Sequence, residues 1–244
     1  MSTIAGAGDP GPPVPFADVR GLVVGNGNDF DPGFVGQRFR ERGYSFIECF
    51  RERPDQWPAL DGIDLVLSLG SEWNVYRPET AALVDAEAAL LRDATSREIP
   101  LFAICFGAQV LSHALTGAVT RLEEPEIGWC EIDALPGYPD AVAAGPWMEW
   151  HYDTFTVPEG FRELARTAAG PQLVVGRRVL ATQLHPECTE TMVAAWLGMG
   201  GADQLRERGR DPADFMAETR ENTVASRANA HAVVDWFLEE VATS

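Results

Sequence analysis

Short apolar segments alternate with helical segments along the first half of the chain, and this alternation constrains the fold more than any other feature. The apolar runs are rich in β-branched residues, and the segments between them have helical spacing. Nearly continuous apolar strands are typical of a parallel sheet that helices cover on both faces. The expected strands are 20–26, 44–50, 63–70 and 100–105, and the expected helices are 33–43, 79–97 and 107–116.

The sequence therefore predicts an α/β fold with a mostly parallel central sheet. Residues 118–185 are rich in Gly, Pro and Trp, and their short runs (128–135, 171–176 and 178–184) are typical of small antiparallel additions. Helical spacing returns from 190 to 244 with a glycine-rich break at 198–201, and the apolar face at 230–242 is expected to pack on the sheet. We expect a disordered leader at 1–18, a main domain at 19–195 and a helical extension at 196–244 packed on that domain.

Cys105 stands where a predicted strand ends and a predicted helix begins. In an open α/β sheet, chemistry lies beyond the carboxyl ends of the strands. Ala103 and Gly107 flank the cysteine two positions away on either side, which leaves room for the tight turn of a nucleophile elbow. The start of a helix also favours the thiolate, the attacking form of cysteine. Taken alone, this short pattern also fits a buried apolar cysteine, which is the more common case.

A second segment, VLATQLHPE at 179–187, leads an apolar run into His185 and then Glu187. A cysteine nucleophile needs a base, and the base needs a third group that orients it. Pro186 fixes its own φ, and the two-residue spacing allows the Glu187 carboxylate to reach the far nitrogen of the imidazole. The alternative for His185 is a surface histidine in a turn, although the chain contains only four histidines.

A third segment is the polar loop that follows the run 63–70. Gly70 suits a loop with exposed backbone N–H groups, and such an N–H together with that of Phe106 would form an oxyanion hole. An ordinary strand-to-helix loop remains the alternative.

Charge and cysteine content narrow the classes of function. The chain has 19 basic and 37 acidic residues, a formal charge of −18, which repels phosphate backbones and anionic lipid. We therefore expect neither nucleic acid nor a membrane as a partner. Four dispersed cysteines without a signal peptide or a C-x-x-C motif indicate reduced thiols and a cytoplasmic protein. No cluster has metal-ligand spacing, so neither a metal nor a cofactor is expected.

Together these segments resemble the class-I (triad-type) glutamine amidotransferases, especially stand-alone proteins similar to the amidotransferase part of GMP synthases. The family's elbow motif, G-[IV]-C-x-G-x-Q, reads AICFGAQ at 103–109, and its H-P-E motif is intact at 185–187. EIGW at 126–129 and WHYD at 150–153 also match common family segments. The resemblance covers residues 19–195 and implies a flavodoxin-like fold.

The resemblance also implies roles for individual residues. The implied triad is Cys105 as nucleophile, His185 as base and acid, and Glu187 as the orienting carboxylate. The implied oxyanion hole consists of the backbone N–H groups of Gly70 and Phe106. The implied substrate contacts are Gln109, Trp150, His151, Tyr152 and Asp153. Two features depart from the family: Ala103 replaces a glycine, and a loop that often reads G-G-P reads LGS at 69–71, with Trp73 as an apparent insertion.

The implied reaction is hydrolysis of the side-chain amide of L-glutamine through a cysteinyl acyl-enzyme, which releases glutamate and ammonia. The chain has no phosphate-binding loop of the G-x-x-x-x-G-K-[ST] type, so we expect a separate ATP-dependent synthetase to receive the ammonia. Two alternatives remain open. One is a stand-alone hydrolase of γ-glutamyl amines or peptides, and the other is an inactive binding or regulatory homologue.

Overall fold

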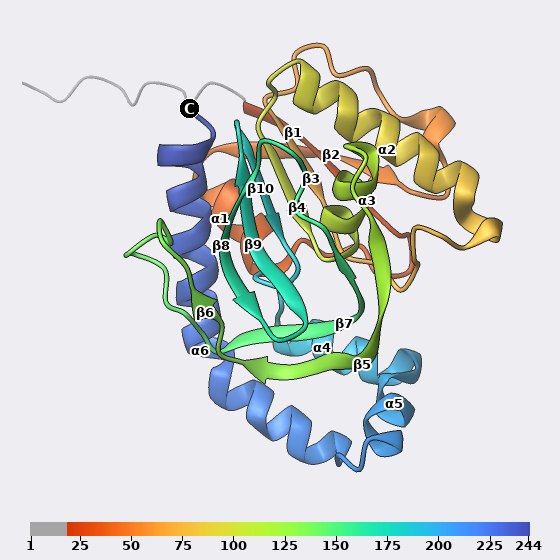
Figure 1. The fold of residues 1–244 in the computed structure, drawn as a ribbon, viewed down its shortest axis with the longest axis vertical. Coiled ribbons are helices and arrows are strands. Elements are labelled where there is room, and N and C mark those ends of the chain that lie inside the picture. Colours follow the sequence, from red (N-terminus) through yellow and green to blue (C-terminus); the bar gives the residue numbers. More distant parts are fainter. Residues whose placement is uncertain (1–18) are drawn as a thin grey trace, which may run out of the picture.

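A sheet of eight strands forms the centre of the computed structural model, which describes residues 19–244 (Figure 1). The predicted leader at 1–18 lies outside the described residues. The strand order is β2-β1-β3-β4-β10-β9-β8-β6, in which the first five strands run parallel and the last three add by antiparallel pairing. The strands are β1 Val19–Gly25, β2 Tyr44–Phe50, β3 Leu65–Ser68, β4 Leu101–Ile104, β6 Asp133–Ala134, β8 Arg162–Thr167, β9 Gly170–Gly176 and β10 Val179–Thr182.

Two further strands, β5 (Val119–Cys130) and β7 (Trp147–Phe155), pair antiparallel in a sheet of their own at one end of the central sheet (Figure 1). Their register places Glu126 opposite His151 and Trp129 opposite Met148. This small sheet lies beyond the carboxyl ends of the parallel strands, where α/β folds carry their chemistry.

Helices cover both faces of the central sheet. The core between the sheet and α2 and α3 is separate from the core between the sheet and α1 and α6. In β4, Leu101 and Ala103 enter the first core while Phe102 and Ile104 enter the second. Both faces are therefore buried, which explains why the strand is apolar at every position. The helices are α1 Gly33–Glu41, α2 Ala81–Ser96, α3 Phe106–Ala114, α4 Glu190–Trp196, α5 Ala202–Glu207 and α6 Pro212–Trp236.

The predicted α/β class and mostly parallel sheet are confirmed, and so are the four predicted strands and three predicted helices of the first half, within a few residues. One strand was misplaced. The run 178–184 is not an antiparallel addition, because β10 pairs parallel with β4 in the middle of the sheet and antiparallel only with β9. The run 128–135 is also not one strand, since β5 ends at Cys130 and β6 begins at Asp133.

The C-terminal segment is helical, with a kinked turn at Leu197–Gly201 between α4 and α5. After α6, a last helical turn at Phe237–Val241 completes the chain's contact with the core. Val233, Val234 and Phe237 are buried there, and the Phe237 ring lies 5.3 Å from that of Phe102 in β4. The predicted packing of 230–242 on the sheet is therefore present. The division into a main domain and an extension remains an interpretation.

No helix within residues 19–244 combines the length and apolarity that crossing a membrane requires.

Candidate active site

Cys105 occupies the sharp turn between β4 and α3. Its φ of 48° lies in the left-handed region that residues other than glycine rarely adopt. The turn is fixed on one side by a hydrogen bond from the Cys105 N–H to Thr182 O (2.7 Å). On the other side Gly107 lies so close to Ser68 that a Cβ at this position would overlap the serine hydroxyl and carbonyl oxygens. A strained cysteine at the start of a helix, held by a close strand–helix approach, has the geometry of a nucleophile elbow.

His185 and Glu187 form a buried pair just after β10. The backbone N–H of His185 donates to Met148 O in β7, and its Nδ1 lies 2.8 Å from Glu187 Oε1. The ring also packs edge-on against Trp196, with centroids 5.1 Å apart. Burial alone would lower the pKa of His185, but the Glu187 carboxylate and the Cys105 sulfur raise it well above its usual value. The pair therefore holds an imidazole with a fixed orientation and a high affinity for a proton.

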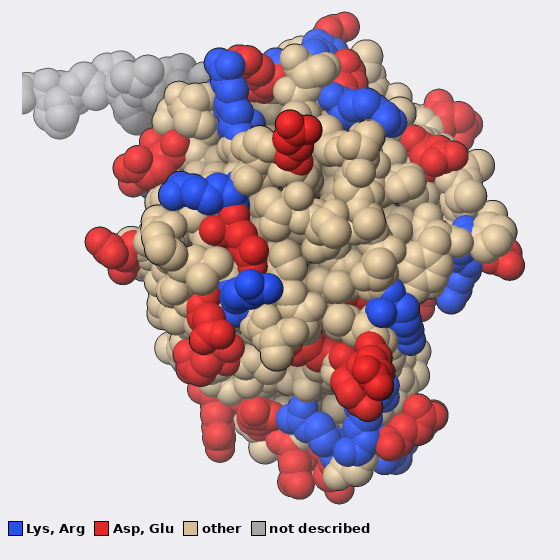
Figure 2. Space-filling view, viewed as in Figure 1, with Lys and Arg blue, Asp and Glu red and all other residues tan. Residues whose placement is uncertain are grey.

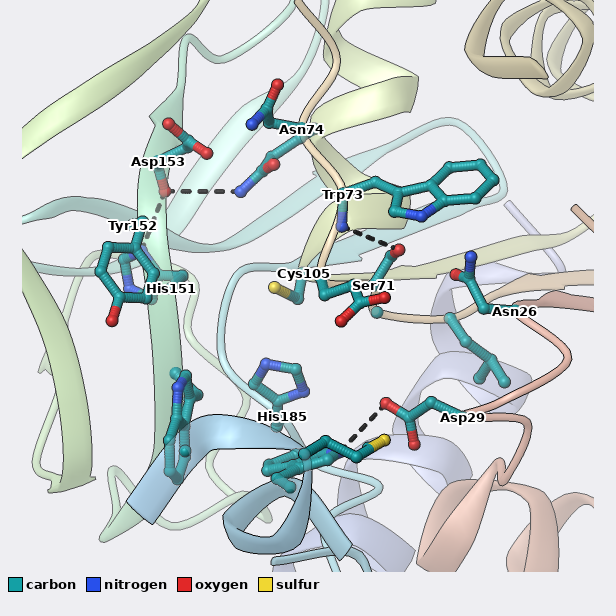
Figure 3. A pocket seen from close by; sticks show the side chains of 18 of the residues that line it. Asn26, Asp29, Ser71, Trp73, Asn74, Cys105, His151, Tyr152, Asp153 and His185 are labelled. Atoms are coloured by element: carbon teal, nitrogen blue, oxygen red, sulfur yellow. Dashed lines mark hydrogen bonds between the residues drawn. The ribbon is translucent and has the colours of Figure 1, made fainter. Parts of the chain in front are cut away.

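The remaining nitrogen of His185 faces the cavity beside Cys105 (Figure 3). Within residues 19–244, His185 Nε2 has no hydrogen-bond partner. Cys105 Sγ instead accepts a hydrogen bond from Gln183 Nε2 (3.4 Å). The free nitrogen is available to exchange a proton with the thiol or with a group bound next to it.

Two segments next to Cys105 carry unpaired backbone N–H groups. Gly70 follows β3, and a Cβ placed on it would lie 3.7 Å from Cys105 Cβ and 3.0 Å from His185 Cε1. Phe106 is the first residue of α3, where a helix leaves its N–H groups unpaired. The N–H groups of Gly70, Ser71 and Phe106 donate to no other group in the described part of the chain. This set of free donors is suited to stabilising negative charge on an oxygen next to Cys105.

Gly70, Ser71, Cys105 and His185 line a cavity of about 420 Å³. Asp29 lies at one side of it, where its carboxylate accepts a hydrogen bond from the Trp196 indole (3.0 Å). Burial raises the pKa of Asp29 above its usual value. Asp153 lies at the other side and accepts a hydrogen bond from the Tyr76 hydroxyl (2.6 Å). Polar groups thus stand on both sides of the cysteine (Figure 3).

Gln109 is buried, and it borders the cavity. Its Nε2 donates to Gln183 Oε1 (3.2 Å) and to the carbonyl oxygen of Asp153 (3.4 Å). Since Gln183 in turn donates to Cys105 Sγ, the two glutamines connect the sulfur to β7. The structure therefore brings Gln109 to the wall of the cavity, next to the β7 segment that the sequence singled out.

The four neighbouring residues 150–153 all border the cavity. Trp150 Nε1 and the Tyr152 hydroxyl both donate to Gln204 Oε1, at 3.0 and 2.9 Å. His151 and Asp153 alternate with them along β7 and are buried. The β7 strand therefore joins α5 to the cavity wall.

His151 belongs to a buried polar cluster with Glu126 and Glu149. Its Nδ1 lies 2.9 Å from Asp153 O, and its Nε2 lies 3.1 Å from Glu126 Oε2 and 3.4 Å from Glu149 Oε2. Burial would lower the pKa of His151, but the two carboxylates raise it to about 10. Burial raises the pKa of Glu149 to about 7.

This cluster is the group of side chains within residues 19–244 whose spacing could hold a metal ion. Its shared oxygen, Glu126 Oε2, is already within hydrogen-bond distance of three groups, namely His151 Nε2, Thr167 Oγ1 and Gln172 Nε2. That arrangement fits a carboxylate paired with an imidazolium better than an open set of metal ligands. Both ring nitrogens of His151 therefore have partners within the protein.

Sequence reasoning did not identify Gln183, Asp29 or Gln204. Gln183 stands two positions before His185, so its place near the site could have been inferred from the motif. Asp29 and Gln204 carry no such signal, because their partners Trp196 and Trp150 lie 167 and 54 positions away in the sequence.

A family model and several relatives of known name match this chain, and all of them are glutamine-dependent enzymes by their descriptions. A family model described as glutamine amidotransferase class-I matches residues 76–195. The glutamine-hydrolysing GMP synthase of Aquifex aeolicus is 34% identical over 183 residues, and that of Aeropyrum pernix is 30% identical over 230 residues. These alignments cover 70% and 87% of this chain but 33% and 41% of those proteins. The chain thus spans a third to two fifths of the length of these relatives.

Solved structures share the fold. A glutamine amidotransferase from Thermotoga maritima superposes with a TM-score of 0.82 at 22% identity, covering 92% of this chain and 100% of that one. A protein from Thermoplasma acidophilum that is described as one subunit of a GMP synthase gives a TM-score of 0.57 at 20% identity and covers 79% of this chain and 98% of that one.

Proposed function

Because the chain belongs to the class-I glutamine amidotransferase family, we propose that it hydrolyses the side-chain amide of L-glutamine and supplies the ammonia to a separate synthetase. The observation that carries this proposal is the convergence of three features on one cavity. They are the strained Cys105 at an elbow, the His185–Glu187 pair with a free Nε2, and the unpaired backbone N–H groups of Gly70 and Ser71 beside Cys105.

The proposed chemistry is acyl transfer through a thioester. The Cys105 thiolate attacks the amide carbon of glutamine, and the carbonyl oxygen becomes an oxyanion that accepts hydrogen bonds from the N–H groups of Gly70 and Phe106. His185 then gives its proton to the leaving nitrogen, which departs as ammonia. A water molecule loses a proton to His185 and attacks the thioester, which releases glutamate and restores the thiolate.

In this proposal Glu187 keeps Nδ1 of His185 protonated, so that Nε2 points its lone pair or its proton at the reacting groups. Gln109 and the segment of Trp150, His151, Tyr152 and Asp153 hold the amino-acid end of the substrate. The Asp153 carboxylate, which is almost fully buried and borders the cavity, is suited to the positively charged α-amino group.

A synthetase is proposed as the acceptor of the ammonia because the relatives matched in sequence are named glutamine-hydrolysing GMP synthases. The solved structure that is described as one subunit of a GMP synthase is matched over 98% of its own length and shares this fold. We further propose a cytoplasmic location, which the four free cysteines support.

A second candidate is hydrolysis of a γ-glutamyl amine or peptide without any synthetase. The size of the cavity favours considering it, because about 420 Å³ falls in the range of pockets that hold ligands larger than a single amino acid. The catalytic steps would be the same, with a substituted amine leaving in place of ammonia.

The test is an assay of glutamate release from L-glutamine and from γ-glutamyl-p-nitroanilide. Wild-type protein should release glutamate from glutamine, and Cys105→Ala should not, while Cys188→Ala, a buried cysteine without an elbow, should retain activity. Cleavage of the anilide but not of glutamine would favour the second candidate. If neither substrate were cleaved, with or without a synthetase, the chain would be an inactive homologue.

A further inference from the structure

Arg51 lies behind the loop that carries Gly70, on the side away from the cavity. It directly follows β2, its side chain is 1% exposed, and it is absent from the cavity lining. Its guanidinium donates to two consecutive carbonyl oxygens, those of Leu69 (2.6 Å) and Gly70 (2.8 Å). One buried cation thus holds two successive peptide units of the loop.

The orientation of these carbonyls fixes the orientation of the N–H groups. Both peptide bonds are trans, so the N–H of Gly70 points opposite to the Leu69 carbonyl and the N–H of Ser71 points opposite to the Gly70 carbonyl. With both carbonyls directed at Arg51, both N–H groups are directed away from it. Gly70 and Ser71 border the cavity, whereas Arg51 does not, so the two donors lie on the side of the loop that faces the cavity. Successive N–H groups that point the same way form a concavity suited to an anion.

Arg51 also contacts the other side of the proposed oxyanion hole. Its guanidinium lies over the ring of Phe106, 4.9 Å from the ring centroid. Phe106 supplies the N–H that follows the nucleophile. A single side chain therefore touches both segments that carry donors, although Gly70 and Phe106 lie 36 positions apart in the sequence.

Further hydrogen bonds fix the orientation of the Arg51 guanidinium. Glu87 of α2, itself 1% exposed, accepts from Arg51 Nε (2.7 Å) and from a terminal nitrogen (3.1 Å). Asn26 accepts a further hydrogen bond (2.8 Å), and Ser68 donates to the same glutamate (2.7 Å). Burying an ion pair rarely stabilises a fold more than apolar side chains of the same shape would. Stability alone therefore does not explain the buried Arg51–Glu87 pair.

We propose that Arg51, held by Glu87, is a positioning residue of the oxyanion hole. The inference rests on the proposed acyl transfer at Cys105. Arg51 orients the N–H groups of Gly70 and Ser71 toward the developing oxyanion and keeps Phe106 in register with them. Its charge also polarises the two carbonyls, which strengthens the N–H groups of the same peptide units as donors.

A donor set that acts on the oxyanion stabilises the transition state and not the bound substrate. Arg51→Lys keeps the charge but loses the planar fork that holds two carbonyls and a carboxylate together. We expect this variant to lower kcat about 10- to 100-fold, less than the 10²–10³-fold that removing a donor costs. KM should remain within about threefold, because the substrate contacts are elsewhere.

The rate at which iodoacetamide alkylates Cys105 distinguishes the proposed role from a general structural defect, because such a defect would change this rate. This displacement builds no oxyanion on the reagent's carbonyl, so it reports the thiolate and its contact with His185 but not the oxyanion hole. Arg51→Lys should therefore alkylate at the wild-type rate while losing kcat. The sequence contains no lysine, so the introduced ε-amine is the only one in the chain. Its resistance to an amine-reactive reagent would show that it is buried.

Arg38→Lys is the matched control. Arg38 also makes a two-pronged contact with a carboxylate, Asp235 (2.9 and 2.7 Å), but it joins α1 to α6 and does not border the cavity. Its kcat should equal that of wild type. A second variant, Arg51→Met combined with Glu87→Leu, removes both charges together and should fold, yet show the same loss of kcat.

Wild-type kcat in Arg51→Lys would overturn the proposal, and so would equal losses of kcat and alkylation rate. If wild type cleaved neither glutamine nor γ-glutamyl-p-nitroanilide, the proposed function would be wrong, and hydrogen exchange would then decide the positioning claim by itself. Backbone amides of residues 66–76 should exchange faster in Arg51→Lys than in wild type or Arg38→Lys. Equal exchange in all three would overturn that claim too.

Discussion

The contact between Glu187 and His185 is the clearest electrostatic feature among the individual side chains. Both groups are nearly inaccessible, and the carboxylate lies 2.8 Å from Nδ1. Because burial disfavours a charged imidazole, the protonated form of His185 depends on the negative groups beside it. The pKa of this histidine should therefore respond to any change at position 187.

Glu187→Gln should lower the pKa of His185, because it removes a carboxylate that favours the imidazolium. It should also lower kcat by about two to four orders of magnitude, since an amide does not hold the required tautomer as a carboxylate does. An NMR titration of the four imidazoles would measure the pKa. Glu190→Gln, which removes an exposed partner of Arg220, should change neither quantity. An unchanged His185 pKa in Glu187→Gln would contradict this account of the pair.

Functional residues that occur in short sequence motifs can be predicted from the sequence. Residues that act through contacts with distant segments of the chain cannot. Cys105, His185 and Glu187 sit in local patterns whose spacing reflects their chemistry. Arg51 has no such pattern, since its partners are Glu87 in a distant helix and two backbone carbonyls. Contacts to backbone atoms leave no trace in the identity of the partner residue.

Among the elements, the turn from β4 to α3 depends most on a single small residue. A side chain at Gly107 would collide with Ser68 of β3, and Ser68 is part of the Arg51–Glu87 network. Gly107→Ala should destabilise the protein by about 1–3 kcal/mol and reduce glutamate release. Gly198→Ala, where a Cβ meets nothing within 4 Å, is the control and should be neutral in both assays. Urea denaturation and the glutamate assay measure the two effects, and a stable, active Gly107→Ala would refute the tight elbow.

Glu149 lies in β7, which pairs with β5, and its side chain is fully buried. This residue should make the free energy of unfolding depend on pH. Burial raises its pKa from 4.5 to about 7, so the folded state binds a proton that the unfolded state has already lost in this interval. The stabilisation is complete below about pH 4.5 and decreases as the pH rises through 7, by about 3 kcal/mol from this group. Glu149→Gln should remove most of this decrease in unfolding free energy with rising pH.

Unfolding free energies at pH 4.5 and pH 7 test the effect. The exposed Glu159→Gln serves as the control and should keep the wild-type slope. If the unfolding free energy changed equally between pH 4.5 and pH 7 in wild type and in Glu149→Gln, Glu149 would not be the source of the pH dependence.

Element types in the first half of the chain could be predicted because β3 and β4 are buried at every position, β1 is buried over most of its length, and the helices show apolar stripes. The position of β10 could not. Its apolar run fits either a central or a peripheral strand, and its parallel pairing with β4 is decided by tertiary packing. β7 carries two Trp, a His and two acidic residues, and its burial depends on β5 and α5, so its strand character was not apparent from alternation.

For the whole molecule, the C-terminal helices complete the core on the α1 face of the sheet. Phe237 is fully buried and contacts the rings of Phe39 and Phe102, which come from the first half of the chain. Phe237→Ala should cost about 3–5 kcal/mol of unfolding free energy. Val224→Ala, at a position 80% exposed on α6, should change stability by less than about 0.5 kcal/mol. A small effect of Phe237→Ala would indicate that the C-terminal segment folds independently of the sheet.

Charged side chains of both signs are interspersed on the surface. On the face shown in Figure 2, acidic side chains are scattered and the basic ones are mixed among them. Every basic side chain is an arginine, and several form pairs with carboxylates.

The most direct test of the central claim is to detect the acyl-enzyme. Wild-type protein is mixed with L-glutamine and quenched in acid, and intact mass and peptide mapping then locate any adduct. We expect a single added γ-glutamyl group, attached to Cys105, and none in Cys105→Ala. An adduct on Cys49, Cys130 or Cys188, or glutamate release without any adduct on Cys105, would contradict this expectation.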